Sequence, residues 1–137
     1  MNTLANKSVL IVDDDPGMLR ALEKVLSREG LQVSRATWVR DGIEELKNHA
    51  TPFDLVITDL RMPMASGLMI MHAMRNAYPS VPVIIITAYG NPEMTPAWWA
   101  EQGAAAYLEK PIEAPQLLET VHRVLSDSAK AISSGAR

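Results

Sequence analysis

The sequence lacks cysteine, a signal-peptide pattern and any apolar run of the roughly 18 residues that a membrane span needs. Without cysteine the chain can form no disulfide and can hold no metal through thiolates, which fits a reducing compartment. A net charge of −3 gives no broad basic field for nucleic acid or for an anionic membrane. We therefore expect a soluble, cytoplasmic domain that neither binds nucleic acid directly nor enters a membrane.

The chain does contain five short strand-like runs within its 137 residues. Three of them are apolar throughout, as in strands buried on both faces of a parallel sheet: residues 9–12, 55–58 and 81–87. Residues 31–36 alternate more and suit an edge strand, and residues 105–108 are a weaker fifth candidate.

Helical patterns separate these runs. Apolar residues recur at helical spacing over residues 19–26, 39–46, 68–78 and 117–125. Alternating strands and helices predict one α/β domain, an open sheet covered on both faces. We expect that domain to span residues 1–125. Residues 126–137 lack an apolar period, and we expect a flexible tail or the start of a linker there.

Acidic residues follow two of the predicted strands. Asp13 and Asp14 come directly after the first strand, and Asp59 ends the third. If these strands are neighbours, three carboxylates crowd one edge of the sheet, where mutual repulsion favours a bound cation. Oxygen ligands without Cys or a nearby His indicate a hard divalent ion, most plausibly Mg²⁺. Taken singly, each aspartate is also explained as an ordinary loop residue after a strand.

Two other aspartates have structural explanations. Asp15 precedes Pro16 and a helical pattern, which is typical of an N-cap followed by proline in the first turn. Asp54 lies five residues before Asp59, so it belongs to the opposite edge of the sheet.

A hydroxyl and an ammonium complete the predicted edge. Thr87 ends the fourth strand-like run, and Lys110 follows the fifth. Beside a carboxylate–metal cluster, both side chains suit an anion that forms there, such as a phosphoryl group. Individually, Thr87 is also explained as a strand residue and Lys110 as a surface charge.

Four stretches together resemble the receiver domains of two-component response regulators: IVDDDP, ITDLRMP, IIITAYG and YLEKP, in that order over residues 7–125. The stretch TAYG is also similar to receivers attached to ATP-dependent transcriptional activators of the NtrC type. The resemblance implies a flavodoxin-like, doubly wound α/β sandwich with five parallel strands in the order 2-1-3-4-5.

The resemblance also implies roles for particular residues. Asp59 would be the phosphoacceptor, and Mg²⁺ would be held by Asp13, Asp14, Asp59 and the backbone carbonyl of Arg61. Thr87 would be the switch hydroxyl, and Lys110 would contact the phosphoryl group. The Lys110–Pro111 peptide bond would be cis. Tyr107 matches the family's rotating aromatic residue, although a plain strand aromatic explains it equally well.

The function implied is Mg²⁺-dependent transfer of a phosphoryl group to Asp59 from a sensor histidine kinase or a phosphotransfer protein. The chain would catalyse only its own modification and its reversal, and is otherwise not an enzyme. Phosphorylation would then alter the surface of the fourth helix, fifth strand and fifth helix for a downstream output domain or protein, or for a homodimer.

Two alternatives remain at this point. One is a pseudo-receiver that acts as a constitutive interaction module; the complete set of acidic residues argues against it. The other is an aspartyl-phosphate phosphatase, which typically has a second carboxylate two residues after the nucleophile, where this chain has Arg61.

The region after Thr87 departs from the family pattern. Thr95 and Pro96 predict an N-cap followed by a short fourth helix. Trp98 and Trp99 are adjacent, so they point about 100° apart on that helix. We expect one of them inside and the other partly exposed; the alternative is that the exposed one anchors a partner or a dimer.

Overall fold

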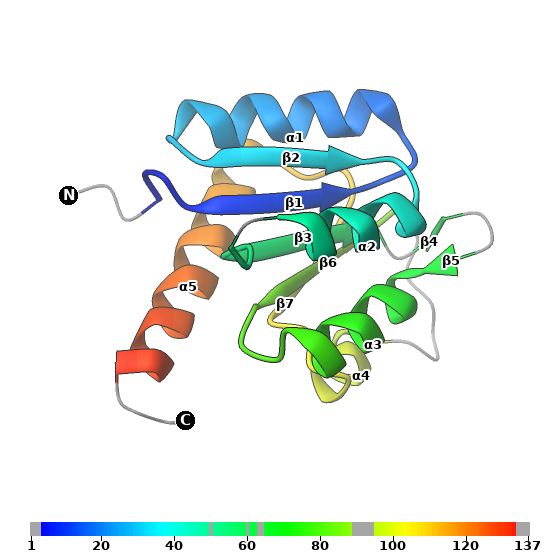
Figure 1. The fold of residues 1–137 in the computed structure, drawn as a ribbon. Coiled ribbons are helices and arrows are strands. Elements are labelled where there is room, and N and C mark those ends of the chain that lie inside the picture. Colours follow the sequence, from blue (N-terminus) through cyan, green and yellow to red (C-terminus); the bar gives the residue numbers. More distant parts are fainter. Residues whose placement is uncertain (1–3, 50, 60, 63–64, 89–94, 134–137) are drawn as a thin grey trace.

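The computed structural model describes residues 4–49, 51–59, 61–62, 65–88 and 95–133 (Figure 1). Its main sheet contains five parallel strands in the order β2-β1-β3-β6-β7. The strands are β1 (Ser8–Val12), β2 (Gln32–Ala36), β3 (Leu55–Asp59), β6 (Val83–Thr87) and β7 (Ala106–Glu109). Counted along the chain, this is the order 2-1-3-4-5, so the predicted doubly wound fold is confirmed.

Helices cover both faces of this sheet. They are α1 (Pro16–Arg28), α2 (Val39–Asn48), α3 (Gly67–Ala77), α4 (Pro96–Glu101) and α5 (Ala114–Ser133). Apolar side chains of α1 and α5 share one buried core with the sheet, while α2, α3 and α4 contribute to the other. The sheet is therefore the middle layer of a three-layer sandwich, as Figure 1 shows.

The burial of the strands follows their composition. Every residue of β1, β3 and β6 is buried, which explains why these strands are apolar and β-branched throughout. The edge strand β2 leaves Gln32 and Arg35 exposed and buries Ala36, in line with its mixed sequence. All five strands point the same way, so their carboxyl ends meet at one edge of the sheet (Figure 1).

Two features differ from what the sequence led us to expect. Helix α5 continues to Ser133, so residues 126–133 are helical rather than a flexible tail. This segment contains two Ala and one Lys, which are strong helix formers, and a helix that is already packed extends at one hydrogen bond per residue. The structure also contains a short antiparallel pair, β4 (Arg61–Met62) and β5 (Ala65–Ser66), in the connection between β3 and α3. The domain boundary at residue 125 stays a prediction.

In the part of the chain that the structure describes, no helix has both the length and the apolar character to cross a bilayer.

Candidate functional site

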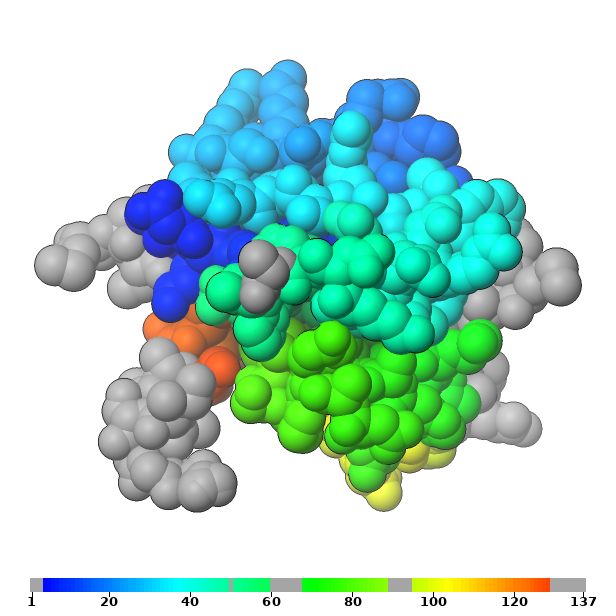
Figure 2. Space-filling view, viewed as in Figure 1, coloured from blue at the N-terminus to red at the C-terminus, as the bar shows by residue number. Residues whose placement is uncertain are grey.

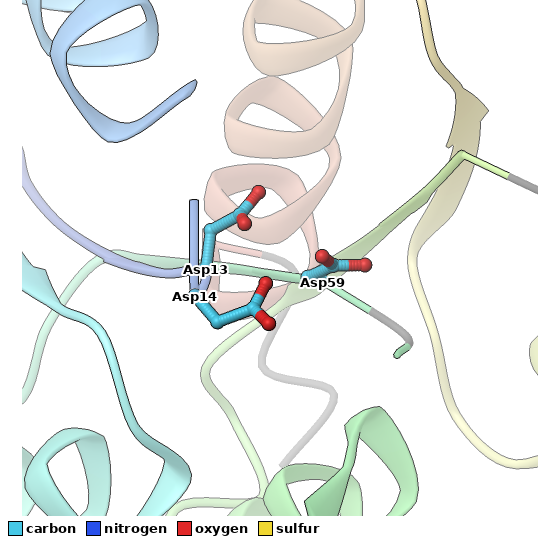
Figure 3. A group of neighbouring side chains, drawn as sticks. All are labelled: Asp13, Asp14 and Asp59. Carbon is cyan, nitrogen blue, oxygen red and sulfur yellow. The ribbon is translucent and has the colours of Figure 1, made fainter. Parts of the chain in front are cut away.

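Three carboxylates gather at the carboxyl ends of β1 and β3. These strands are hydrogen-bonded neighbours with Val12 opposite Thr58, so the residues that follow Val12 come close to Asp59. One oxygen from each of Asp13, Asp14 and Asp59 lies within 4.8 Å of the others. Figure 3 shows the three side chains together at this edge of the sheet.

The cluster combines buried and accessible carboxylates. Asp13 is 0% exposed and Asp59 is 5% exposed, whereas Asp14 faces solvent. Both oxygens of Asp13 have donors: Oδ1 accepts from the Asp15 amide at 2.9 Å, and Oδ2 accepts from Lys110 Nζ at 3.0 Å. Lys110 Nζ also reaches Asp59 Oδ2 at 3.4 Å, so one ammonium bridges the two buried carboxylates.

The site is short of positive charge. With all three carboxylates ionised, one ammonium leaves two negative charges without a counter-charge in a partly buried space. Burial raises the pKa of Asp13 and the nearby charge of Asp59 adds to this, while the hydrogen bonds from Asp15 and Lys110 oppose it only in part. Burial alone would lower the pKa of Lys110, but its hydrogen bonds to Asp13 and Asp59 and their charges raise that pKa above the ordinary value. Lys110 therefore stays protonated and still does not balance the cluster.

This donor set fits a hard divalent cation. Oxygen ligands alone are present, and a doubly charged ion would neutralise the two remaining negative charges. Mg²⁺ commonly uses only one or two carboxylates and keeps several waters, which suits the exposed Asp14 beside Asp59. Both oxygens of Asp13 already accept hydrogen bonds, from Asp15 and Lys110, so a cation at Asp13 would compete with these donors.

Thr87 and Lys110 lie at the same edge of the sheet. Asp59 pairs with Ile86 in the β3–β6 ladder, so Thr87 is the next residue toward the edge, and it is fully buried. The Lys110 amide donates to the Thr87 carbonyl at 2.7 Å, and this hydrogen bond links the end of β7 to the end of β6. The Lys110–Pro111 peptide bond is cis, as the resemblance implied.

The two aspartates that we assigned to structure are confirmed in that role. Asp15 Oδ1 accepts from the Gly17 amide at 2.9 Å and caps α1. Asp54 Oδ2 accepts from the Ser8 amide at 2.8 Å and from the Ser8 hydroxyl at 3.3 Å, at the opposite end of β3.

The contacts of Arg61 and Tyr107 do not by themselves indicate the roles that the resemblance implied. Arg61 belongs to β4, which follows β3 closely, and its role as a carbonyl ligand stays a prediction. Tyr107 is half-buried on β7 and packs against the core shared by α2, α3 and α4. Burial and the nearby charge of Glu109 raise the pKa of its phenol, so it is a neutral side chain at ordinary pH.

The fourth helix is as short as predicted. Helix α4 has six residues, with Pro96 in its first turn, and Thr95 Oγ1 accepts from the Trp98 amide at 3.1 Å. Trp99 is fully buried and Trp98 is half-buried, so one indole is inside and the other partly exposed, as expected. The two rings contact edge to face, with centroids 5.0 Å apart.

Two details of the site could not be predicted from the sequence. It did not indicate that Lys110 lies closer to Asp13 than to Asp59, because side-chain reach across the intervening strands cannot be read from strand order. It also did not indicate that Trp99 Nε1, although buried, has no hydrogen-bond partner among the described residues.

Comparisons with known proteins identify relatives of this chain. The sequence model of the family described as the response regulator receiver domain matches residues 9–122. The chain is 36% identical over 124 residues to the transcriptional regulatory protein GlrR of Escherichia coli, which covers 90% of this chain and 27% of that protein. It is 36% identical over 122 residues to the response regulator protein PilR of Pseudomonas aeruginosa, covering 89% and 27% respectively. The chain thus spans about a quarter of the length of these curated relatives.

Solved structures share the fold. The signal receiver domain of a LuxO repressor protein from Vibrio parahaemolyticus superposes with a TM-score of 0.85 at 25% identity, covering 94% of this chain and 97% of that one. The receiver domain dimer of beryllofluoride-activated NtrC4 superposes with a TM-score of 0.80 at 26% identity, covering 88% and 98%.

Proposed function

This chain belongs to the response regulator receiver domain family, and we propose that it is a phosphorylation switch in which Asp59 accepts the phosphoryl group. The observation that carries the proposal is the partly buried cluster of three carboxylates, which has more negative charge than the ammonium of Lys110 can offset. Such an arrangement costs stability unless a cation offsets the charge, and carboxylates with perturbed pKa values are typical of functional sites.

Asp59 is the nucleophile in this proposal. Its carboxylate, fixed at the end of β3, attacks the phosphorus of a phosphohistidine on a sensor kinase or phosphotransfer protein. The P–N bond breaks, its electron pair leaves with the imidazole, and the imidazole takes up a proton as the aspartyl phosphate forms. Water later attacks the phosphorus and releases inorganic phosphate, which restores the Asp59 carboxylate.

The residues around Asp59 prepare this transfer. Asp14 and Asp59 would hold Mg²⁺ with the Arg61 carbonyl, and Asp13 would contribute to the same site. When bound, the ion offsets negative charge on the phosphoryl oxygens. Lys110 donates to another phosphoryl oxygen from its position between Asp13 and Asp59.

The switch is proposed to involve Thr87, Tyr107 and the surface of α4, β7 and α5. The Thr87 hydroxyl would donate a hydrogen bond to the new phosphoryl group, and Tyr107 would move into the space that opens next to α4. The altered surface would bind an output partner or a second copy of the chain; the structure of activated NtrC4 is that of a receiver domain dimer.

The chain itself is proposed to be a receiver over residues 1–125 with the beginning of a linker after it. The curated relatives are much longer than the matched region, so we propose that an output domain acts downstream of this receiver in the cytoplasm.

The proposal is tested by intact-mass measurement after incubation with acetyl phosphate and Mg²⁺. The wild-type chain should gain one phosphoryl group, the gain should disappear with EDTA, and Asp59→Asn should gain none. If the wild-type chain binds no Mg²⁺ and gains no mass, it is a pseudo-receiver and the proposed switch is wrong.

A further inference from the structure

A cavity lies where the edge strand β2 ends, between the start of α1 and the start of α2. It measures about 370 Å³, which falls in the range of small-molecule sites, about 300–1,000 Å³. Figure 2 shows α1 along the top margin of the molecule, with β2 and the start of α2 beneath it. The residues that line the cavity differ from those of the carboxylate cluster, so it is a separate candidate site.

The lining of this cavity joins an apolar wall to polar groups of both signs. The wall consists of Pro16 and of two buried residues, Leu19 and Ala36. Apolar walls with a few polar groups are typical of cavities that bind small organic molecules. The polar side chains that line it are Arg20, Arg35, Thr37 and Asp41.

The charged groups of the cavity do not neutralise one another. In the part of the chain that the structure describes, neither Arg20 nor Asp41 forms an ion pair. Arg35 pairs through Nη1 with Glu23 at 3.2 Å, which leaves other N–H donors of its guanidinium group for a ligand. The Arg20 guanidinium is directed toward the first turn of α1, since a Cβ atom added at Gly17 would lie 4.0 Å from Nη2 of Arg20. Two cations and one anion therefore line the same cavity without an ion pair between them.

This pattern of charge favours a zwitterion as the ligand. A carboxylate can accept charge-assisted hydrogen bonds from Arg20 and Arg35, and an ammonium group can donate one to Asp41. Asp14 and Asp15 are exposed directly before α1, so a ligand with several negative charges would be repelled at that end of the cavity. A ligand with positive charge alone would be repelled by the two guanidinium groups.

We infer that this cavity binds a free amino acid with an apolar side chain. Arg20 and Arg35 hold its carboxylate, Asp41 holds its ammonium group, and the apolar wall contacts its side chain. The Asp13 amide donates to the Ala36 carbonyl at 3.1 Å, so the ligand contacts a residue that is hydrogen-bonded to the carboxylate cluster. Binding here requires no phosphoryl transfer and goes beyond the proposed function.

The test measures the binding of L-leucine, L-methionine and L-phenylalanine to the whole chain. Calorimetry gives the Kd, and amide shifts in heteronuclear NMR spectra locate the ligand. Isocaproate, which is leucine without its ammonium group, and isoamylamine, which is leucine without its carboxylate, serve as matched probes. Inorganic phosphate is the probe for a simple anion site.

Two pairs of variants separate the cavity from the surrounding surface. Arg20→Gln and Asp41→Asn each remove one charge from the lining. Lys24→Gln and Glu44→Gln remove the same charges from exposed positions about one turn further along α1 and α2, outside the lining. All four substitutions are at exposed positions, so each variant should give the NMR spectrum of a folded chain.

We expect at least one of the three amino acids to bind with a Kd below about 1 mM and to shift the amides of Leu19, Ala36 and Thr37. Each cavity variant, and each leucine analogue, should bind or be bound roughly tenfold more weakly, because a hydrogen bond between charged groups is lost. The two control variants should stay within twofold of wild type.

Four results would overturn the inference. These are no binding of any of the three amino acids, amide shifts centred away from the cavity, equal weakening in cavity and control variants, and binding of isocaproate or inorganic phosphate as tight as that of the amino acids. The last result would identify a site for simple anions in which Asp41 has no part.

Discussion

The two ends of β3 each carry an aspartate, and they use it in opposite ways. Asp54, directly before the first residue of the strand, accepts two hydrogen bonds from Ser8 and belongs to no group of three or more potential metal ligands among the described residues. Asp59, at the other end, shares its surroundings with Asp13 and Asp14 and with one ammonium. Asp54 therefore has a structural role, whereas Asp59 belongs to a cluster whose negative charge is greater than the charge of its one ammonium.

An aspartate at a strand end is therefore not by itself informative about function. The two ends differ in how many carboxylates share the available donors: one carboxylate accepts from the amide and hydroxyl of Ser8 at one end, and three carboxylates surround one ammonium at the other. Excess negative charge is costly in a partly buried space, so it persists where a ligand offsets it.

The largest expected effect comes from removing the ammonium at the Asp59 end. Lys110→Ala should slow labelling of Asp59 by acetyl phosphate by roughly 100-fold, because a charged donor to the phosphoryl oxygens is lost. Lys7→Ala, which removes an exposed lysine just before β1 at the opposite end of the sheet, is the matched control and should label at the wild-type rate. Labelling of Lys110→Ala within twofold of wild type would show that the ammonium is not used.

A smaller effect is expected on the free energy of unfolding, which should respond differently to substitutions at the two ends of β3. In urea unfolding with EDTA present, Asp54→Asn should lower the free energy of unfolding by about 1 kcal/mol, since a charged acceptor of two Ser8 hydrogen bonds becomes neutral. Asp13→Asn should not lower it, because burial and the charge of Asp59 disfavour the ionised form of Asp13. If Asp13→Asn were less stable than Asp54→Asn, the charges of the carboxylate cluster would be compensated without a metal ion.

The smallest expected effect is in the pH dependence of the metal-free protein. The pKa of Asp13 is raised in the folded state, so the folded chain holds this proton more tightly than the unfolded chain. The resulting stabilisation is fully present below the ordinary pKa of 3.8 and is lost as pH rises through the raised value. In EDTA, wild-type protein should therefore gain stability relative to Asp13→Asn as pH falls from neutral, and a relative loss would contradict the assignment.

Most of the fold could be predicted from the sequence. Three apolar, β-branched runs predicted the central strands, because burial on both faces allows few other residues, and an alternating run predicted an edge strand. The end of α5 could not be predicted, since helix propagation past Leu125 depends on packing earlier in the helix rather than on an apolar period. The pair β4–β5 was also missed, as two-residue strands carry no detectable alternation.

The candidate site could be predicted in its members but not in its contacts. Parallel strands bring their ends together, so Asp13, Asp14 and Asp59 were expected at one edge, and they meet there. The hydrogen bonds of Lys110 to Asp13 and Asp59 depend on side-chain reach and burial, which the sequence does not specify.

Mn²⁺ binding followed by electron paramagnetic resonance, with Mg²⁺ as competitor, tests the contrast between the two ends of β3 most directly. The wild-type chain and Asp54→Asn should each bind one ion that Mg²⁺ displaces, while Asp14→Asn and Asp59→Asn should bind it much more weakly. If the wild-type chain binds no ion, or if Asp54→Asn loses the ion as Asp59→Asn does, then the carboxylates beside Lys110 are not a metal site and the contrast drawn here is wrong.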